Sequence, residues 1–335
     1  MWTMQPSTLT IHEVFEKERR YTVPLFQRSY VWTEEGEWEP LWSDIERQAN
    51  NSLQTLSNDR QSTTSHFLGA IVLNVAKVFG RGLARSEIID GQQRLTTLQI
   101  FLAALRDFAQ NVERDVAETA KRLTLNPLRD PKSDERFKVW PTNADRLVFM
   151  NVLEAGSLDE VLARFGKTPL GGKTAMPRMA EAYKFFFNAI QQFVEEDCPS
   201  ETSSPDRYQG TKLSQGDRLY AILHALKTSL QFVVIELEEK DDPQVIFETL
   251  NARGQPLLPS DLIRNTVFLD ASYKGIDIDS LYQKYWRHFD ERRSPSPDDR
   301  GEDRFWHQFE RQGRLLRPSR LRKNDGFSAW QCIVE

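Results

Sequence analysis

Residues 87–98 hold the residue types and spacing in this chain that are best suited to chemistry, and they read Glu-Ile-Ile-Asp-Gly-Gln-Gln-Arg-Leu-Thr-Thr-Leu. The pattern predicts a short buried strand that turns at Gly91 directly into a helix, with Arg94 in the first helical turn. A helix start offers unpaired backbone N–H groups and the positive end of the helix dipole, and a guanidinium adds forked, charged donors. The segment therefore predicts a phosphate-binding turn. A plain strand–turn–helix join with a solvated arginine fits the same residues.

Other sequence patterns for phosphate or metal chemistry do not fit. Gly172-Lys173-Thr174 looks like the end of a P-loop, but the residue five positions before Gly172 is Lys167, where that motif needs a glycine. The preceding segment, 158–165, has a helical pattern where the motif needs a strand. The sequence contains no HExxH, CxxC or GxSxG motif, and its histidines, which form no metal-binding cluster, are His12, His66, His224, His288 and His307.

Composition limits the class of protein. The chain has 335 residues, of which 39% are hydrophobic, so it is long enough for two domains that each have a core. No stretch approaches the roughly 18 uninterrupted apolar residues of a membrane span, and the first residues do not resemble a secretory signal. Cys198 and Cys332 cannot form a disulfide framework or a zinc cluster. We therefore expect a cytoplasmic protein with no membrane partner.

The net charge of −5 argues against a surface coated in basic residues for tight non-specific binding to nucleic acid. A local basic tail near the end of the chain consists of Arg311, Arg314, Arg317, Arg320, Arg322 and Lys323. The tail is consistent both with a solvated end and with contacts to a phosphate backbone.

The elements that must position the glycine–arginine turn are predicted to form a small α+β domain over residues 1–110. Thr10 and Glu13 make a capping box for a helix to about Arg19, and Pro24 keeps residues 21–32 extended. Hydrophobic periodicity then predicts a helix that includes Trp38, Leu41, Trp42 and Ile45, a polar loop over 52–65, a strand over 66–74, a turn over 80–85, a strand over 87–90, and a helix with the core face Leu95, Leu98, Phe101, Leu102 and Leu105.

Residues 111–335 are predicted to form a mainly helical domain with one or two strands. Met179, Tyr183, Phe186, Ile190 and Phe193 make a helical stripe, residues 221–226 lie in another helix, and residues 230–237 read as a strand. A further helix is expected to begin at the cap Asp242 and end at Gly254, and Ser260 caps the next one.

Three segments taken together resemble the N-terminal domain family of the GmrSD restriction proteins. The first is Pro24-Leu-Phe-Gln-Arg-Ser-Tyr-Val-Trp32. The second combines Phe67-Leu-Gly-Ala-Ile-Val-Leu73 with Ile89-Asp-Gly-Gln-Gln-Arg-Leu-Thr-Thr-Leu98. The third combines Phe247-Glu-Thr-Leu-Asn-Ala-Arg-Gly254 with Ser260-Asp-Leu-Ile-Arg-Asn265. The resemblance covers residues 8 to 290, and its motifs are specific in order and spacing.

The resemblance implies a ParB/sulfiredoxin-like nucleotide-binding fold followed by helices, and a role in bacterial defence against phage DNA. Members of the family include modification-dependent nucleases that hydrolyse nucleotides and the phosphorothioate-sensing effector SspE. Such proteins usually carry a C-terminal HNH nuclease domain, for which this sequence has no motif. We therefore expect the N-terminal half of a longer effector, or a subunit whose nuclease is a partner, with modified DNA and a nucleoside triphosphate with Mg²⁺ as ligands.

The motif and the resemblance together suggest which residues do the work. Asp90, Gln93 and Arg94 are the catalytic candidates, because Arg94 would neutralise charge that grows on the phosphates during hydrolysis. Asp90 either holds Mg²⁺ or caps the following helix. Arg253 either contacts a phosphate or complements the end of a helix dipole. The full set of nucleotide-binding candidates is Gln27, Arg28, Gly91, Gln92, Arg94, Thr96, Thr97, Asn251 and Arg253.

The extended segment offers a candidate sensor for modified DNA, consisting of Pro24, Phe26, Tyr30 and Trp32. Phe26, Tyr30 and Trp32 alternate and so share one face, which is either part of the core or a pocket for a phosphorothioate sulfur or a flipped base. Two functions therefore compete. One is a nucleotide hydrolase gated by modified DNA, and the other is a binding module that switches conformation without turnover.

Overall fold

The computed structural model describes residues 6–24, 27–58, 65–76, 83–127, 133–166, 176–195, 213–237, 241, 246, 267–268, 271 and 274–286. The chain divides into two compact units. The first consists of Met1–Pro24 and Ser29–Phe247, and the second consists of Leu25–Arg28 and Glu248–Glu335. Each unit is described by itself below.

A mixed sheet of six strands forms the base of the first unit, in the order β1-β6-β3-β4-β2-β5. Its strands are β1 (Ser7–Thr10), β2 (Arg19–Thr22), β3 (His66–Ala76), β4 (Ala84–Asp90), β5 (Val139–Trp140) and β6 (Leu230–Leu237). Strand β3 pairs antiparallel with β4 and parallel with β6. The β3–β4 pair and strand β6, which comes much later in the sequence, therefore form the middle of the sheet. The strand that the sequence predicts over 230–237 is confirmed.

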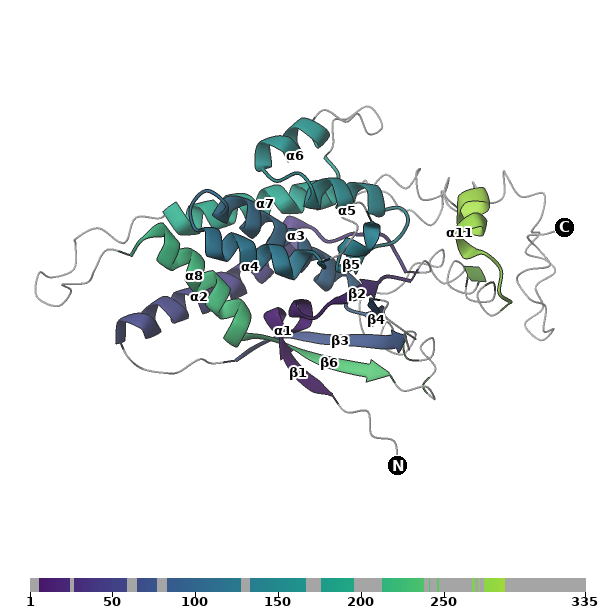
Figure 1. Ribbon diagram of the computed structural model, residues 1–335, viewed down its shortest axis with the longest axis horizontal. Helices are drawn as coiled ribbons and strands as arrows, with labels where there is room; N and C mark the ends of the chain where they lie inside the picture. Colours follow the sequence, from purple (N-terminus) through teal and green to yellow (C-terminus); the bar gives the residue numbers. More distant parts are fainter. Residues whose placement is uncertain are drawn as a thin grey trace, which may run out of the picture. The chain divides into compact units, whose positions relative to one another are not determined.

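The helices of the first unit gather on one side of this sheet (Figure 1). They are α1 (Ile11–Glu16), η1 (Glu34–Trp38), α2 (Glu39–Asn58), α3 (Gln92–Ala109), α4 (Arg114–Thr124), η2 (Asp134–Arg136), α5 (Arg146–Leu153), α6 (Leu158–Phe165), α7 (Arg178–Glu195) and α8 (Gln215–Thr228). In the second unit, α11 (Ile278–Leu281) continues into η3 (Tyr282–Trp286), and Phe268, Tyr282 and Trp286 form its small core. The expected α+β fold class is confirmed.

Helix α3 lies at the centre of the first unit and is buried on nearly every side. It packs against α4 and α7, and its Phe101 ring lies edge-on to Phe186 at 5.5 Å between centroids. All five residues of its predicted core face are fully buried. The other faces are buried as well, including Thr97 and Gln99, which a one-sided amphipathic pattern did not predict.

Three predicted boundaries are wrong. Strand β4 begins at Ala84, before the predicted strand over 87–90, and so includes the last residues of the predicted turn over 80–85. The first helix ends at Glu16, and Arg19 already belongs to β2, so the capping box starts a shorter helix than expected. Residues 52–58 are helical and extend α2, because Leu53 is buried and the Ser52 hydroxyl donates to the Gln48 carbonyl at 2.9 Å inside the helix.

The division between the compact units also differs from the predicted boundary near residue 110. Strands β5 and β6 lie beyond that boundary, yet β5 pairs with β2 and β6 pairs with β1 and β3. The first 110 residues therefore share one sheet and one core with residues from later in the chain. The predicted cap at Asp242, the helix stop at Gly254 and the basic tail from Arg311 lie outside the described residues.

Lys138 is a buried cation next to β5, with 1% of its surface exposed. Its Nζ donates to the Lys17 carbonyl at 2.9 Å and to Asn126 Oδ1 at 3.0 Å, so it joins the turn after α1 to the segment after α4. Burial lowers the pKa of Lys138 to about 8, while Glu18 and Glu16 act weakly in the opposite direction.

We expect the free energy of unfolding of the wild-type protein to rise relative to that of Lys138→Met between about pH 8 and pH 10.5. The pKa of Lys138 is about 8 in the folded state and close to the ordinary 10.5 in the unfolded chain. The unfolded state therefore binds more protons in this interval, and stability increases with pH. Urea titrations of both proteins at several pH values across the interval measure the difference. A difference that stays constant would contradict the prediction, because all other titrations are common to both proteins.

Candidate functional site

The predicted strand, glycine turn and helix are present as one continuous structure. Strand β4 ends at Asp90, Gly91 has φ 94° and ψ 10°, and α3 begins at Gln92. This left-handed conformation favours glycine, because a Cβ would be strained there and would also lie 3.4 Å from the Ile71 side chain. No side chain caps the start of α3. The first backbone N–H groups of a helix have no partner within the helix and commonly bind anions.

The Arg94 side chain folds back from α3 onto strand β3. Its Nη1 donates to the Ala70 carbonyl at 2.8 Å, and its guanidinium lies over Gly69. Gly69 has φ +106°, and a Cβ there would lie 3.2 Å from both Cζ and Nη2 of Arg94. The pairing of β3 with β6 shifts register between Phe67 and Ala70, which explains why the Ala70 carbonyl can accept a bond from a side chain.

The electrostatic setting of Arg94 suits an anion. Burial lowers the pKa of Arg94, and the nearby Asp90 carboxylate opposes this shift. A guanidinium stays charged in proteins even so, and this one has lost part of its water. Among the described residues, Arg94 makes one side-chain hydrogen bond, which leaves Nε and Nη2 as donors for a ligand. A phosphate oxygen would replace the lost hydration and meet the N-terminus of α3 at the same time.

Gln93 points away from this turn and holds the chain that precedes η1. Its Oε1 accepts from the Val31 N–H at 2.9 Å, and its Nε2 donates to the Ser29 carbonyl at 3.0 Å. The side chain is buried. The amide is therefore occupied by backbone partners, and the geometry favours a positioning role for Gln93 over the catalytic one that the sequence suggests.

Thr97 and Tyr30 belong to a buried chain of hydrogen bonds. Trp38 Nε1 donates to the Tyr30 hydroxyl at 2.8 Å, the Tyr30 and Thr97 hydroxyls are 2.7 Å apart, and Thr97 donates to the Gln93 carbonyl at 2.8 Å. Burial raises the pKa of Tyr30, so its phenol keeps its proton. The Tyr30 backbone N–H also donates to Asp145 Oδ2 at 2.9 Å. Tyr30 and Thr97 thus form part of the core, and neither hydroxyl is directed at a ligand.

The remaining predicted residues are distributed as follows. Gln92 is half-buried and Thr96 is buried in the first turns of α3. Pro24 is buried after β2, and the half-buried Trp32 packs against the main core. Gln27 and Arg28 belong to the second compact unit, whereas Arg94 belongs to the first. Phe26, Asn251 and Arg253 lie outside the described residues, so their predicted roles stay predictions.

The fit of Mg²⁺ to this turn depends on Asp90. Within the described ranges, no group of three or more His, Cys, Asp or Glu residues could hold a metal ion. A magnesium ion in proteins is commonly held by one or two carboxylates together with phosphate oxygens and water. Asp90 can supply one such carboxylate, and the phosphates of a bound nucleotide would have to supply further ligands.

Gly69 and the Ala70 carbonyl are the site residues that the sequence analysis missed. A signal was present, because a lone glycine inside an otherwise apolar strand indicates a bulge or a close approach by another group. The residue that approaches Gly69 is Arg94, which lies on α3, directly after strand β4. The pairing of β3 with β4 brings the two residues together.

The first unit is an α+β domain in which a glycine turn joins a central strand to a buried helix. Arg94 lies in the first turn of that helix, so the class is an α+β domain with a candidate phosphate-binding turn. The chain belongs to the family of the GmrSD restriction endonuclease N-terminal domain, whose family model matches residues 11–268. The protein is thus part of a restriction endonuclease family. No curated protein matches the chain. None of the helices in the described ranges is long and apolar enough to cross a membrane.

We expect Gly69→Ala to lower the free energy of unfolding more than Gly156→Ala does. Both glycines have positive φ, so each substitution carries the cost of a strained backbone, about 1 to 2 kcal/mol. Only at Gly69 does the new Cβ meet another group, the Arg94 guanidinium, whereas nothing lies within 4 Å of a Cβ at Gly156. Displacing Arg94 adds about 1 kcal/mol for the lost hydrogen bond.

Urea denaturation of the two variants measures this difference, and a double-mutant cycle with Arg94→Ala assigns its cause. The extra cost of Gly69→Ala should shrink when Arg94 is absent. An equal cost in both backgrounds would show that the Gly69–Arg94 contact does not matter.

Proposed function

We propose that this chain is the nucleotide-hydrolysing sensor domain of a DNA-modification-dependent restriction effector, acting on GTP or a related nucleoside triphosphate. Membership of the restriction family supports the general role. The observation that carries the nucleotide assignment is the pairing of Arg94, with Nε and Nη2 as donors for a ligand, with the uncapped N-terminus of α3. In this proposal the turn binds the phosphates, and turnover controls a nuclease in a C-terminal domain or a partner.

Arg94 would stabilise the negative charge of the phosphates. Its guanidinium is held by the Ala70 carbonyl and packed on Gly69, so it is oriented before a ligand arrives. A preorganised donor stabilises charge that develops in the transition state without the cost of reorganisation. Asp90 would hold Mg²⁺, which would supply positive charge to the phosphates when bound, and Gly91 and Gln92 would contribute backbone N–H groups. Gln93 would act indirectly, by fixing the start of α3 against Ser29 and Val31.

A second candidate function is a nucleotide-binding switch without turnover. The specific observation in its favour is that Gln93, a candidate for orienting an attacking water, is engaged with backbone groups on both sides of its amide. Asp90 is then the remaining candidate for that task among the residues proposed as catalytic. Binding alone would suffice for such a switch if the nucleotide favoured one of two conformations of the protein.

Sensing of phosphorothioate or glucosylated DNA is proposed for the segment from Pro24 to Trp32. The burial of Tyr30 within the hydrogen-bond chain narrows this proposal to Phe26 and the half-buried Trp32. An aromatic ring can stack on a flipped base or contact a weakly hydrated sulfur.

We expect phosphate release from GTP, ATP, CTP or UTP with Mg²⁺ to depend on Arg94. Removal of one preorganised charged donor lowers kcat by about a hundredfold, so Arg94→Ala should lose turnover by that order. Arg94→Lys keeps the charge but loses the fork, and it should recover only part of the activity. The matched control is Arg85→Ala, an exposed arginine on β4 that pairs with Glu135 at 2.5 Å.

The assay is run with and without phosphorothioate-bearing or glucosylated DNA. Turnover that requires Arg94 and rises with one modified DNA supports the gated hydrolase. Nucleotide binding that requires Arg94 without any turnover supports the switch. Turnover that is unchanged in Arg94→Ala would overturn the assignment of this turn.

A further inference from the structure

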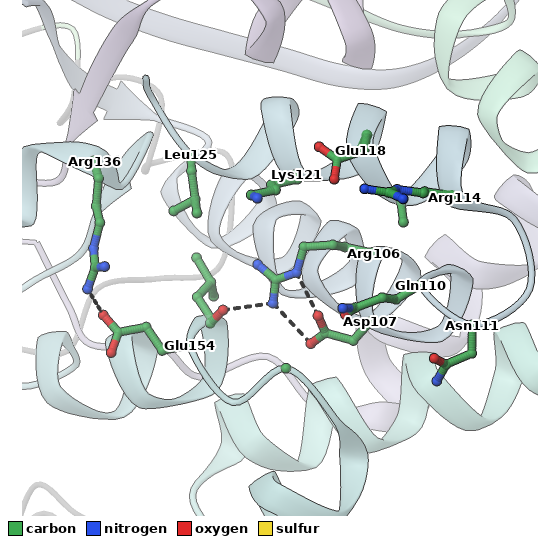
Figure 2. Close-up of a pocket in the computed structure, with 13 residues that line it drawn as sticks. Arg106, Asp107, Gln110, Asn111, Arg114, Glu118, Lys121, Leu125, Arg136 and Glu154 are labelled. Atoms are coloured by element: carbon green, nitrogen blue, oxygen red, sulfur yellow. Dashed lines mark hydrogen bonds and ion pairs between the residues drawn. The ribbon is translucent and has the colours of Figure 1, made fainter. Parts of the chain in front are cut away.

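A polar cavity lies at the opposite end of α3 from Arg94. Its volume is about 760 Å³, and it lies between the last turns of α3, one face of α4 and the end of α5 (Figure 2). With a rise of about 1.5 Å per residue, the 18 residues of α3 place the two ends roughly 25 Å apart. The cavity is therefore separate from the proposed nucleotide turn.

Arg106 stands in the middle of this cavity and is rigidly held. Its Nε and Nη2 donate to the two carboxylate oxygens of Asp107 at 2.6 and 3.0 Å, and Nη2 also donates to the Leu153 carbonyl at 2.8 Å (Figure 2). Tyr183 donates to the same carboxylate at 2.7 Å. Among the described residues Arg106 Nη1 has no hydrogen-bond partner, so one oriented N–H₂ group is left for a ligand.

Helix α4 adds a charged wall. Arg114, Glu118 and Lys121 follow each other at helical spacing and therefore share one face, which lines the cavity. Figure 2 shows Lys121 and Arg114 on the side of α4 that faces Arg106. Within the part of the chain that the structure describes, neither cation forms an ion pair, whereas Arg136 on the far side is paired with Glu154.

The charges of the lining define the ligand. Two of its four cations, Arg106 and Arg136, are paired with two of its three acids, Asp107 and Glu154. Arg114 and Lys121 then face a ligand together with the single acid Glu118. The amides of Gln110 and Asn111 add neutral donors and acceptors. This set matches a small molecule that has one anionic group and several hydroxyl or amino groups.

We propose that this cavity binds a mononucleotide through its phosphate. Arg106 Nη1, Arg114 and Lys121 would contact the phosphate, while Glu118 and the two amides would accept and donate hydrogen bonds to the sugar and base. The volume lies in the usual range for ligands of that size. A nucleic-acid strand fits less well, because its repeated charges would meet the carboxylates of Glu118 and Glu154. The inference does not depend on the proposed hydrolase.

The test is calorimetric titration of AMP and of inorganic phosphate into the full chain carrying Arg94→Ala, so that the first site does not contribute. We expect AMP to bind more tightly than phosphate, and Lys121→Ala or Arg114→Ala to weaken AMP binding by about tenfold or more. Both side chains are exposed on α4, so the fold should tolerate their removal. Lys184→Ala, an exposed lysine on α7 outside the cavity, is the control.

Two results would overturn the proposal. One is the absence of AMP binding, or AMP binding no tighter than that of phosphate. The other is AMP binding that Lys121→Ala and Lys184→Ala weaken equally, which would indicate general attraction by positive charge. Because every protein in the titration carries Arg94→Ala, none of these outcomes bears on the nucleotide turn.

Discussion

The burial of α3 constrains everything around it. A helix surrounded on nearly all sides must satisfy the polar groups of its first turns inside the protein, because each buried group without a partner costs free energy. Gln93 and Thr97 meet this requirement by bonding Ser29, Val31 and Tyr30. The same bonds fix Ser29, Tyr30 and Val31 against the helix. One turn of α3 therefore organises both the core and this segment before η1.

Arg94 is in the same turn, but its side chain does not take part in these hydrogen bonds of the core. It lies one position after Gln93 and thus points in a different direction, toward the irregular stretch of β3. There Gly69 makes room for the guanidinium, and the interrupted pairing of β3 with β6 provides the Ala70 carbonyl. Two of the glycines with positive φ, Gly69 and Gly91, therefore have complementary roles: Gly69 makes room for the arginine, and Gly91 starts the helix beside it.

The two candidate sites of this unit lie at the two ends of α3. The first end has a charge that is partly desolvated and held by one backbone carbonyl. The last end has Arg106 fixed by Asp107 and Leu153 and flanked by the cations of α4. Between them the helix contributes packing, with rings such as Phe101 against Phe186, and one buried hydrogen bond from Gln99 Nε2 to the Leu123 carbonyl. A buried helix can thus carry a functional group at each end while its middle secures the core.

The sequence by itself determined the local structure of the glycine turn, the strands around residues 66–74 and 230–237, the α+β class and the family. Local rules suffice there, because capping, glycine conformation and apolar periodicity act within a few residues. The limits of helices and domains were harder to predict from the sequence. The extension of α2 and the place of β6 in the central sheet depend on contacts with distant residues. Tertiary structure alone decided which polar residues of the motif are available. From the sequence, Gln93, Thr97 and Tyr30 look like ligand-binding residues. Their side chains instead bond to partners up to 67 positions away and are therefore not available to a ligand, while Arg94 keeps donors for one. A hydrogen bond between distant segments leaves no periodic trace in the sequence, and this is why only the folded chain could separate the two groups.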